Sequence, residues 1–371
     1  MIKVLNIITN GILPEGVTCS WVSILEELKR TKLNKECQID FLVIKDRSNK
    51  KKVDQLNDLG IKTIEINSRN NILNYIYNLI KILKRENYNV IHINGSSSLM
   101  ILELIAGYLA KTPIKIAHSR NTFCRYKTLN KILSYPFRKL TDLKIACGYD
   151  AGKWLFGKDH FSILHNGKNL NKFVFSDKDR IKQRQILKLE NKYVIGHVGN
   201  FNNQKNHKFL IDVFSKINKV IPNSHLVLIG DGPLKKEITQ QINYLGLQND
   251  VTLLGTINDI NVKLNIFDLM LFPSLFEGLP NVVLEWQANG IPSIISNKIT
   301  KECIVTDFVT QLDINNNIEK WVNSTKDIYA KEYKRKENSE VGIKSLSNHG
   351  FDVSKTVNQL IKYYKLHKNE R

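Results

Sequence analysis

The sequence predicts an α/β protein made of two doubly wound domains, each with a parallel sheet. Two observations predict this class. Short apolar runs typical of buried strands alternate with segments of helical periodicity along the whole chain of 371 residues. A polar segment rich in turn-forming residues, 165–173, interrupts this alternation near the middle of the chain. A chain of this length can bury two separate hydrophobic cores.

Strand candidates follow a regular order in both halves. Helical segments separate them, such as 74–86, whose apolar side chains cluster on one side. This alternation is typical of parallel sheets with helices on both faces. The expected strands of the first half are 2–8, 39–44, 61–66, 89–94, 114–118, 143–147 and 161–164. Those of the second half are 193–198, 225–229, 251–254, 268–272 and 293–296.

The composition is that of an ordinary globular protein, with 42% hydrophobic and 24% charged residues. The five cysteines are odd in number and widely scattered, without a C-x-x-C pair, which indicates a reducing cytoplasm and argues against a zinc site. The first residues lack the features of a signal peptide, and the most apolar segment, 99–110, is too short to span a bilayer. We therefore expect a cytoplasmic protein, soluble or peripheral on the inner face of the membrane.

The formal charge of +20 implies an anionic partner. Residues 111–140 hold eight basic side chains and no acidic one, and 125–140 interleaves basic with apolar residues. This pattern predicts docking on an anionic membrane surface. The alternative is an ordinary helix with its apolar residues in the core and its lysines solvated. Pro136 should break the helix and turn part of the segment outwards. The basic residues of the segment are Arg125, Lys127, Lys131, Arg138 and Lys139.

The stretch 271–297 carries the most informative pattern. A buried strand leads into a loop, followed by a helix that is entered at Pro280 and ends at Asn289-Gly290. Free backbone N–H groups at a helix N-terminus attract phosphate through aligned donors and the positive end of the helix dipole. The donors expected here are the N–H groups of Gly278, Leu279 and Asn281.

Two glutamates flank this turn. If the span from Glu277 to Glu285 were helical, the carboxylates would lie about 12 Å apart along the axis, too far for the roughly 5 to 9.5 Å pairs of glycosidases. They could instead hold two parts of one extended ligand by accepting hydroxyl hydrogen bonds. The alternative is a solvated loop carboxylate at Glu277 and a surface helix residue at Glu285.

The pattern F-E-G-L-P-N-V-V-L-E-x-x-A-x-G-x-P closely resembles the E-x7-E signature of the retaining glycosyltransferases of family 4, which have the GT-B fold. The resemblance implies two Rossmann-like domains facing across a cleft, and transfer of a hexosyl unit from a nucleotide-diphosphate sugar with retention of configuration. It assigns sugar hydroxyls to Glu277 and the ribose to Glu285.

The polar segment at the middle of the chain resembles the N-G-x-D-x-x-x-F linker of this family, with Asn169 in place of the aspartate. The implied domains are an acceptor-binding domain over 1–165 and a donor-binding domain over 166–353. In the family the last helix crosses back onto the first domain, and the corresponding segment here is about 354–371.

Other site residues follow from the same resemblance. Gly16 lies in a loop that covers the donor diphosphate in the family, and His118 matches a histidine that contacts the donor sugar, although a lone histidine is more often structural. Lys205 matches the lysine of the family's G-R-x-x-x-x-K segment and is the best diphosphate ligand, since its ammonium is a compact charge with three donors. Asn200 replaces the arginine, for which Arg120 is a possible substitute. Thr256 is at the position where backbone groups meet the nucleobase.

No metal site is predicted. Asp177-Lys178-Asp179 resembles a metal motif of another glycosyltransferase fold, but it lies in a charged helix start, where capping is the better interpretation. We expect catalysis without a metal or other cofactor, using a nucleotide sugar, namely a UDP-sugar, and a lipid-linked saccharide acceptor of bacterial capsule or exopolysaccharide synthesis. The alternatives are a GT-B nucleotide-sugar epimerase, a non-catalytic membrane-docked partner subunit, and a nucleic-acid-binding protein, for which no recognition motif is present.

Overall fold

The computed structural model describes residues 1–14, 16–67, 69–315 and 317–365. The chain divides into two compact units. The first unit comprises Met1–Asn169 and Gly350–Arg371, and the second comprises Leu170–His349. Among the described helices, none combines the length and the apolarity needed to cross a bilayer.

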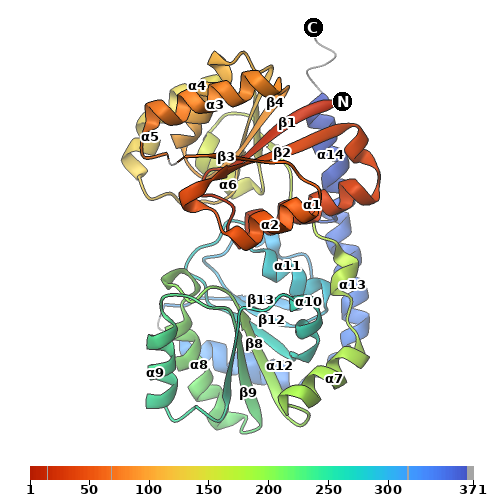
Figure 1. Cartoon of the computed structure of the whole chain (residues 1–371). Helices are drawn as coiled ribbons and strands as arrows, with labels where there is room; N and C mark the ends of the chain where they lie inside the picture. Colours follow the sequence, from red (N-terminus) through yellow and green to blue (C-terminus); the bar gives the residue numbers. More distant parts are fainter. Residues whose placement is uncertain (15, 68, 316, 366–371) are drawn as a thin grey trace. The chain divides into compact units, whose positions relative to one another are not determined.

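The first unit is built on a parallel sheet of seven strands in the order β3-β2-β1-β4-β5-β6-β7 (Figure 1). Helices cover both faces, because alternate residues of each strand point to opposite sides. In β1, Val4 packs with the helices of one face and Leu5 with those of the other. The strands are β1 (Ile2–Ile8), β2 (Cys37–Ile44), β3 (Thr63–Ile66), β4 (Val90–Gly95), β5 (Ile114–Ser119), β6 (Leu143–Ala146) and β7 (Ser162–Ile163).

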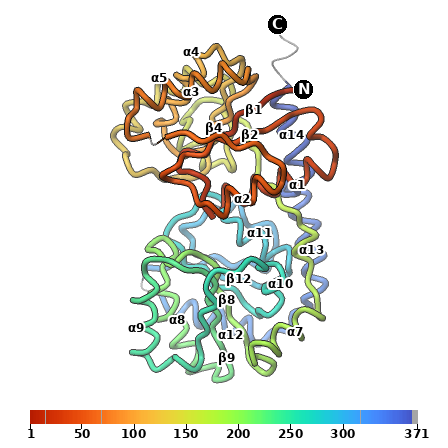
Figure 2. Tube along the Cα trace, viewed as in Figure 1, coloured from red at the N-terminus to blue at the C-terminus, as the bar shows by residue number. Residues whose placement is uncertain are grey.

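The helices of the first unit form two layers. One layer, which includes Trp21 and Leu360, consists of α1 (Gly16–Arg30), α2 (Lys50–Asp58) and α14 (Val353–Lys365). Figure 2 traces α14, coloured blue, beside α1, which it contacts. The other layer consists of α3 (Ile72–Glu86), α4 (Ile101–Leu109), α5 (Lys127–Leu140) and α6 (Tyr149–Phe156).

The second unit repeats this plan with six parallel strands in the order β10-β9-β8-β11-β12-β13. Trp321 and Phe214 contribute to a core cluster that joins α8, α9 and α12 to the sheet. The strands are β8 (Tyr193–Val198), β9 (Ser224–Ile229), β10 (Val251–Gly255), β11 (Leu269–Phe272), β12 (Ser293–Ser296) and β13 (Val309–Leu312). The helices are α7 (Asp177–Leu187), α8 (His207–Val220), α9 (Lys235–Tyr244), α10 (Ile260–Lys263), α11 (Asn281–Ala288), α12 (Ile318–Tyr329) and α13 (Arg335–Asn348).

The predicted class, two doubly wound α/β units, is confirmed. Every expected strand is present within two residues of its predicted ends, and β13 was missed. The units divide at Asn169 and Gly350, because the linker backbone is tied to the first unit: the Lys168 N–H donates to Phe351 O (2.8 Å), and the Val353 N–H donates to Lys168 O (3.0 Å). Of the segment expected to cross back, 366–371 lies outside the described residues.

The expected break at Pro136 was wrong. Helix α5 continues through this proline to Leu140. Phe137, the next residue, is fully buried in the core of the first unit, and its packing outweighs the hydrogen bond that the proline cannot donate.

Candidate functional site

An ion pair joins two of the predicted site residues in the second unit. Lys205, in the short 3-10 helix Asn203–Lys205 after β8, places its Nζ 2.6 Å from Oε1 of Glu277, in the loop after β11. The two side chains are 15% and 11% exposed. The Lys205 ammonium also lies 4.6 Å from the centre of the Phe272 ring. Because β8 and β11 are parallel neighbours, their carboxyl ends meet at one edge of the sheet, where ligands of such sheets bind.

The two loops that carry this pair are fastened to each other. The Leu275 N–H donates to Gln204 O (2.8 Å), and Gln204 Nε2 donates to Phe276 O (2.9 Å). Asn206 Nδ2 adds a longer bond to Pro273 O (3.3 Å). The relative position of the ammonium and the carboxylate is therefore set by backbone contacts on both sides.

Glycines allow neighbouring loops to approach the same edge. Gly230 begins the turn Gly230-Asp231-Gly232-Pro233 after β9; it has φ of +141°, and a Cβ there would lie 2.0 Å from Gly199 O. A Cβ at Gly199 would meet Cε of Lys205 at 3.0 Å. The Gly230 N–H donates to Gly255 O (2.9 Å), which brings the loop after β10 alongside. Thr256, the next residue, is exposed, as is Asn200 after β8.

Helix α11 begins at Asn281, with Pro280 preceding it in an extended conformation. Gly278 and Leu279 thus belong to the loop, and only Asn281 of the three expected donors lies in the helix itself. Glu285 is only 8% exposed, so the alternative of a solvated surface residue was wrong for this position. Glu277 is partly buried and ion-paired, which also excludes a fully solvated carboxylate.

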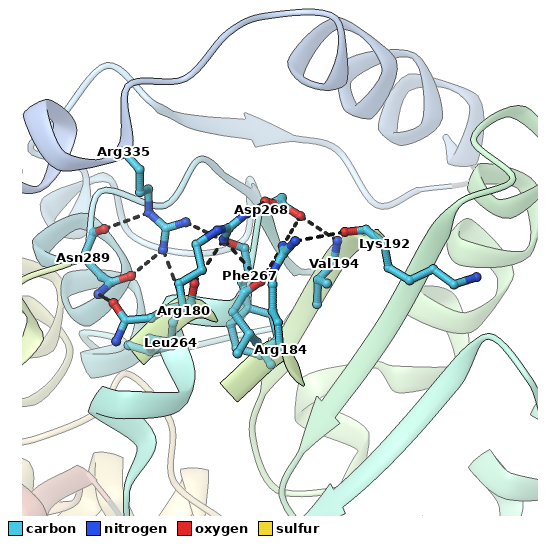
Figure 3. Close-up of polar contacts among 11 residues, drawn as sticks. Arg180, Arg184, Lys192, Val194, Leu264, Phe267, Asp268, Asn289 and Arg335 are labelled. Carbon is cyan, nitrogen blue, oxygen red and sulfur yellow. Dashed lines mark hydrogen bonds and ion pairs between the residues drawn. The ribbon is translucent and has the colours of Figure 1, made fainter. Parts of the chain in front are cut away.

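A partly buried arginine cluster anchors α11 at its other end (Figure 3). Arg335 Nε donates to Asn289 O (2.8 Å), and its Nη1 donates to Phe267 O (2.5 Å). Burial, together with the nearby Arg180 charge, lowers the pKa of Arg335 to about 9. Asp268 balances part of this charge through 2.5 Å contacts with Arg180 and Arg184. The cluster lies at the start of β11, whereas Glu277 follows the end of that strand.

In the first unit His118 is an interior residue, 1% exposed, at the carboxyl end of β5. Its Nδ1 lies 3.0 Å from Nε2 of His92, and His92 Nδ1 lies 2.8 Å from the hydroxyl of Tyr364 on α14. Burial, and then the charge of Arg120, lowers the pKa of both histidines well below the usual value. Both rings are therefore neutral at pH 7.

Arg120 is engaged within its own unit. Its Nε and Nη2 donate to Asn94 Oδ1 (2.9 and 2.7 Å), and its Nη1 donates to Asn166 Oδ1 (2.8 Å). Trp21 Nε1 donates to the same oxygen of Asn94 (3.1 Å). Burial lowers the pKa of Arg120 to about 10, so the group stays charged at neutral pH. In this structure its donors therefore bind Asn94 and Asn166, and its role as a substitute for the family arginine stays a prediction.

Sequence comparison decides the family. Residues 179–345 match the family model described as Glycosyl transferases group 1. The chain is 30% identical over 271 residues to the Escherichia coli UDP-Gal:alpha-D-GlcNAc-diphosphoundecaprenol alpha-1,3-galactosyltransferase. This match covers 67% of this chain and 68% of the relative. The chain belongs to the group 1 glycosyltransferases. This glycosyltransferase is also 29% identical over 312 residues to EpsF of Bacillus subtilis (strain 168), over 80% of each chain.

Solved structures share the fold of this glycosyltransferase. The crystal structure of Anabaena HepE in complex with UDP and glucose matches with a TM-score of 0.77 at 19% identity, over 98% of this chain and 99% of the other. The sucrose-phosphate synthase of Thermosynechococcus elongatus matches with a TM-score of 0.73 at 14% identity, over 98% of each chain. The predicted GT-B fold is thus confirmed.

Two other predicted positions differ from expectation in this glycosyltransferase. Gly16 is the first residue of α1 rather than part of the preceding loop. The conformationally demanding glycine there is Gly11, with φ of +91°, where a Cβ would lie 2.2 Å from Arg47 O.

The residue that caps α7 is Ser176, whose hydroxyl accepts from the Asp179 N–H (3.2 Å). Asp177 and Asp179 lie in the first turn of that helix, where the positive end of the helix dipole stabilises carboxylates.

The predicted basic patch divides into two kinds of residue. Arg125, Lys127, Lys131 and Lys139 are exposed. Arg138 instead points towards Asp159, with its Nε 3.5 Å from the carboxylate, and is only partly exposed.

In the described ranges of the chain, no group of three or more His, Cys, Asp or Glu side chains is arranged to hold a metal.

Sequence reasoning missed the two histidines beside the ion pair. His197 lies in β8 with Nδ1 2.9 Å from Leu271 O, and His207 begins α8, its ring 4.6 Å from that of His197. Burial lowers the pKa of both, to about 4 for His207. The signal was available, since His197 is the penultimate residue of a predicted strand and His207 follows Lys205 by two residues.

Proposed function

We propose that this enzyme transfers a hexosyl unit from a UDP-sugar to a lipid-linked saccharide acceptor in bacterial surface polysaccharide synthesis. The transfer retains the anomeric configuration and needs no bound metal. The observation that carries the proposal is the Lys205–Glu277 pair, held at the carboxyl ends of two neighbouring strands of the second unit.

The pair supplies the two functions that a sugar-diphosphate donor requires. The Lys205 ammonium is a point charge suited to the diphosphate, and the Glu277 carboxylate accepts hydrogen bonds from sugar hydroxyls. In the free enzyme these groups neutralise each other at 2.6 Å. When a sugar donor binds, it replaces this ion pair. The donor phosphate then contacts the Lys205 ammonium, and the sugar hydroxyls donate to the Glu277 carboxylate.

The chemistry then depends on charge that develops on the leaving phosphate. Lys205 and the backbone donors at the start of α11 stabilise that charge, and preorganised donors of this kind are each worth about 10²- to 10³-fold in rate. The acceptor hydroxyl attacks from the face that the nucleotide leaves, and the departing phosphate takes its proton. Glu285 is assigned to the ribose and His118 to the donor sugar, as the family resemblance implies.

The donor and the acceptor proposed for this enzyme are those named for its relatives. The Escherichia coli galactosyltransferase is named for UDP-Gal and for a diphosphoundecaprenol-linked acceptor, and HepE was solved with UDP and glucose. A further relative is named as a capsular polysaccharide biosynthesis glycosyltransferase of Staphylococcus aureus. Such acceptors lie in a membrane, which agrees with a peripheral enzyme on its anionic inner face.

The test is release of UDP from UDP-sugars, selected by thermal shift against the GDP-sugars, with and without a lipid-linked saccharide. For a transferase, we expect UDP release that depends on the acceptor. Equal release of UDP and free sugar without an acceptor would indicate a nucleotide-sugar epimerase instead. Donor binding with no turnover under any condition would indicate a non-catalytic partner subunit, for which Asn200, in place of the family arginine, is the relevant feature.

A further inference from the structure

Exposed apolar side chains gather on three consecutive helices of the first unit. Aliphatic residues are prominent among them: Leu73 on α3 is 82% exposed and Ile132 on α5 is 67% exposed. Soluble surfaces tolerate single residues of this kind, but a group of them marks an interaction site. The exposed apolar residues of these helices and of the turns beside α5 are Ile72, Leu73, Tyr77, Tyr108, Leu109, Phe123, Tyr126, Leu129, Ile132 and Tyr135.

The three helices form one layer. Helix α4 contacts both α3 and α5, and all three pack on the same face of the seven-stranded sheet (Figure 1). Their inner sides supply Leu79, Leu104 and Phe137 to the core, so the exposed residues are additional to those that stabilise the fold. Exposed apolar residues therefore lie on all three helices and not only on the single helix indicated by the sequence.

The same layer carries an excess of positive charge. Residues 71–141 contain only two acidic side chains, Glu86 and Glu103. Both are already neutralised, since Glu86 contacts Lys62 (2.6 Å) and Arg85 (3.1 Å), and the buried Glu103 contacts Arg69 (3.1 Å). The exposed cations of this layer are Lys81, Lys84, Arg85, Lys111, Arg125, Lys127, Lys131 and Lys139.

Four of these cations lie over exposed aromatic rings. The Lys81 ammonium is 4.4 Å from the centre of the Tyr77 ring, and the Lys139 ammonium is 5.8 Å from that of Tyr135. Arg125 and Lys127 lie 5.6 and 5.9 Å from the rings of Tyr126 and Phe123. Each pair presents an apolar body beside a charged end, which suits the boundary between lipid headgroups and acyl chains.

We propose that α3, α4 and α5 form one docking surface for an anionic lipid bilayer. The aliphatic and aromatic side chains enter the headgroup layer, and the ammonium and guanidinium groups bind lipid phosphates. Exposed aliphatic residues favour lipid over nucleic acid, which would use aromatic and basic residues alone. The proposal rests on the proposed function for its partner, because a lipid-linked acceptor is reached at such a surface.

The experiment is co-sedimentation of the full chain with vesicles of phosphatidylglycerol mixed with phosphatidylcholine, and with phosphatidylcholine alone. The charge variant is Lys81→Glu/Lys131→Glu/Lys139→Glu. Its matched control is Lys29→Glu/Lys50→Glu/Lys51→Glu, which changes the net charge equally on α1 and α2, in the opposite layer. A third variant, Leu73→Ser/Ile132→Ser/Tyr135→Ser, keeps the charge and removes apolar contacts.

The wild type should prefer the anionic vesicles. The charge variant should lose about tenfold or more of this affinity, while the control keeps it, because each cation near the surface contributes separately. The apolar variant should lose the binding that persists at high salt. Equal loss in the control, or no preference of the wild type for anionic lipid, would overturn the proposal.

Failure of this inference is separable from failure of the proposed function. Transfer by the wild type to a water-soluble acceptor saccharide tests the enzyme without a membrane. Transfer without vesicle binding would refute only the docking surface. Anionic vesicle binding without any transfer would support the surface and refute the proposed activity.

Discussion

At the scale of single residues, the paired Lys205 and Glu277 carry most of the proposed chemistry. Each group is partly buried, so removal of one leaves the other with an unpaired charge as well as a missing ligand contact. Loss of activity and a modest loss of stability are therefore expected together. The activity of each variant should be expressed per amount of folded protein.

Lys205→Ala and Glu277→Ala should each lower kcat/KM by about 10²- to 10³-fold, because each removes a preorganised contact to the donor. The measurement is UDP release at subsaturating donor. The matched controls are Lys208→Ala and Glu237→Ala, exposed residues of the same unit that should retain activity. Wild-type turnover in either site variant would refute the assignment.

Tyr364→Phe tests the histidine pair of the first unit. Among the described contacts, the Tyr364 hydroxyl has His92 Nδ1 as its partner, so its proton is best donated there. His92 then donates from Nε2 to His118 Nδ1, and His118 carries its own proton on Nε2.

Loss of the hydroxyl should cost about 1 to 2 kcal/mol of stability and free His92 to change its tautomer. Nitrogen-15 NMR of the two rings measures this change directly. The control is Tyr363→Phe, which removes a hydroxyl from the same helix that is bonded to Gln359. Unchanged His92 and His118 spectra in Tyr364→Phe would contradict the proton arrangement.

Among the secondary-structure elements, the positions of the strand ends were predictable from the sequence. The contacts between the loops that follow neighbouring strands were not. The sequence located β11, the loop after it and the start of α11, because apolar runs, glycines and prolines mark these locally. It did not reveal that Lys205 pairs with Glu277, which lies 72 positions away. The burial of Glu285 likewise depends on packing around α11, and β13 is an only partly buried strand with polar residues.

Two ion pairs of equal length provide a test of how burial changes the contribution of an ion pair to stability. Asp268 lies 2.5 Å from Arg184 and is mostly buried, whereas Glu319 lies 2.5 Å from Lys216 and is exposed. Asp268→Asn should cost about 2 to 4 kcal/mol, because it leaves Arg180 and Arg184 without their carboxylate. Glu319→Gln should cost less than about 1 kcal/mol. Chemical denaturation measures both, and equal losses would contradict the role given to burial.

In the whole molecule, five buried histidines with lowered pKa values link stability to pH. The pKa values of His92, His118, His197, His207 and His225 are all lowered in the folded state by burial. The unfolded chain therefore binds protons near pH 6.5 that the folded chain does not, and stability is lost as pH falls.

For His207, whose folded pKa is about 4, the loss between pH 6.5 and 4 is on the order of 3 kcal/mol. Denaturation midpoints should fall steadily from pH 7.5 to 5. A midpoint that stays constant or rises over this interval would show that these rings are protonated in the folded protein.

Metal independence is a separate prediction for the whole enzyme. Transfer should survive EDTA within about twofold, because Lys205 and the backbone donors at α11 stabilise the leaving phosphate. The control is readdition of Mg²⁺ or Mn²⁺ to the treated enzyme. Loss of activity that only a divalent cation restores would mean that a carboxylate site had been misassigned.

Retaining transfer to an acceptor can be tested by the anomeric configuration of the product. With an α-linked UDP-sugar and a lipid-linked saccharide, proton NMR of the released product reports the new linkage from its anomeric coupling constant. A retaining enzyme should form an α linkage, with stoichiometric UDP release. A β-linked product would contradict it, because attack would then have come from the face opposite the leaving phosphate.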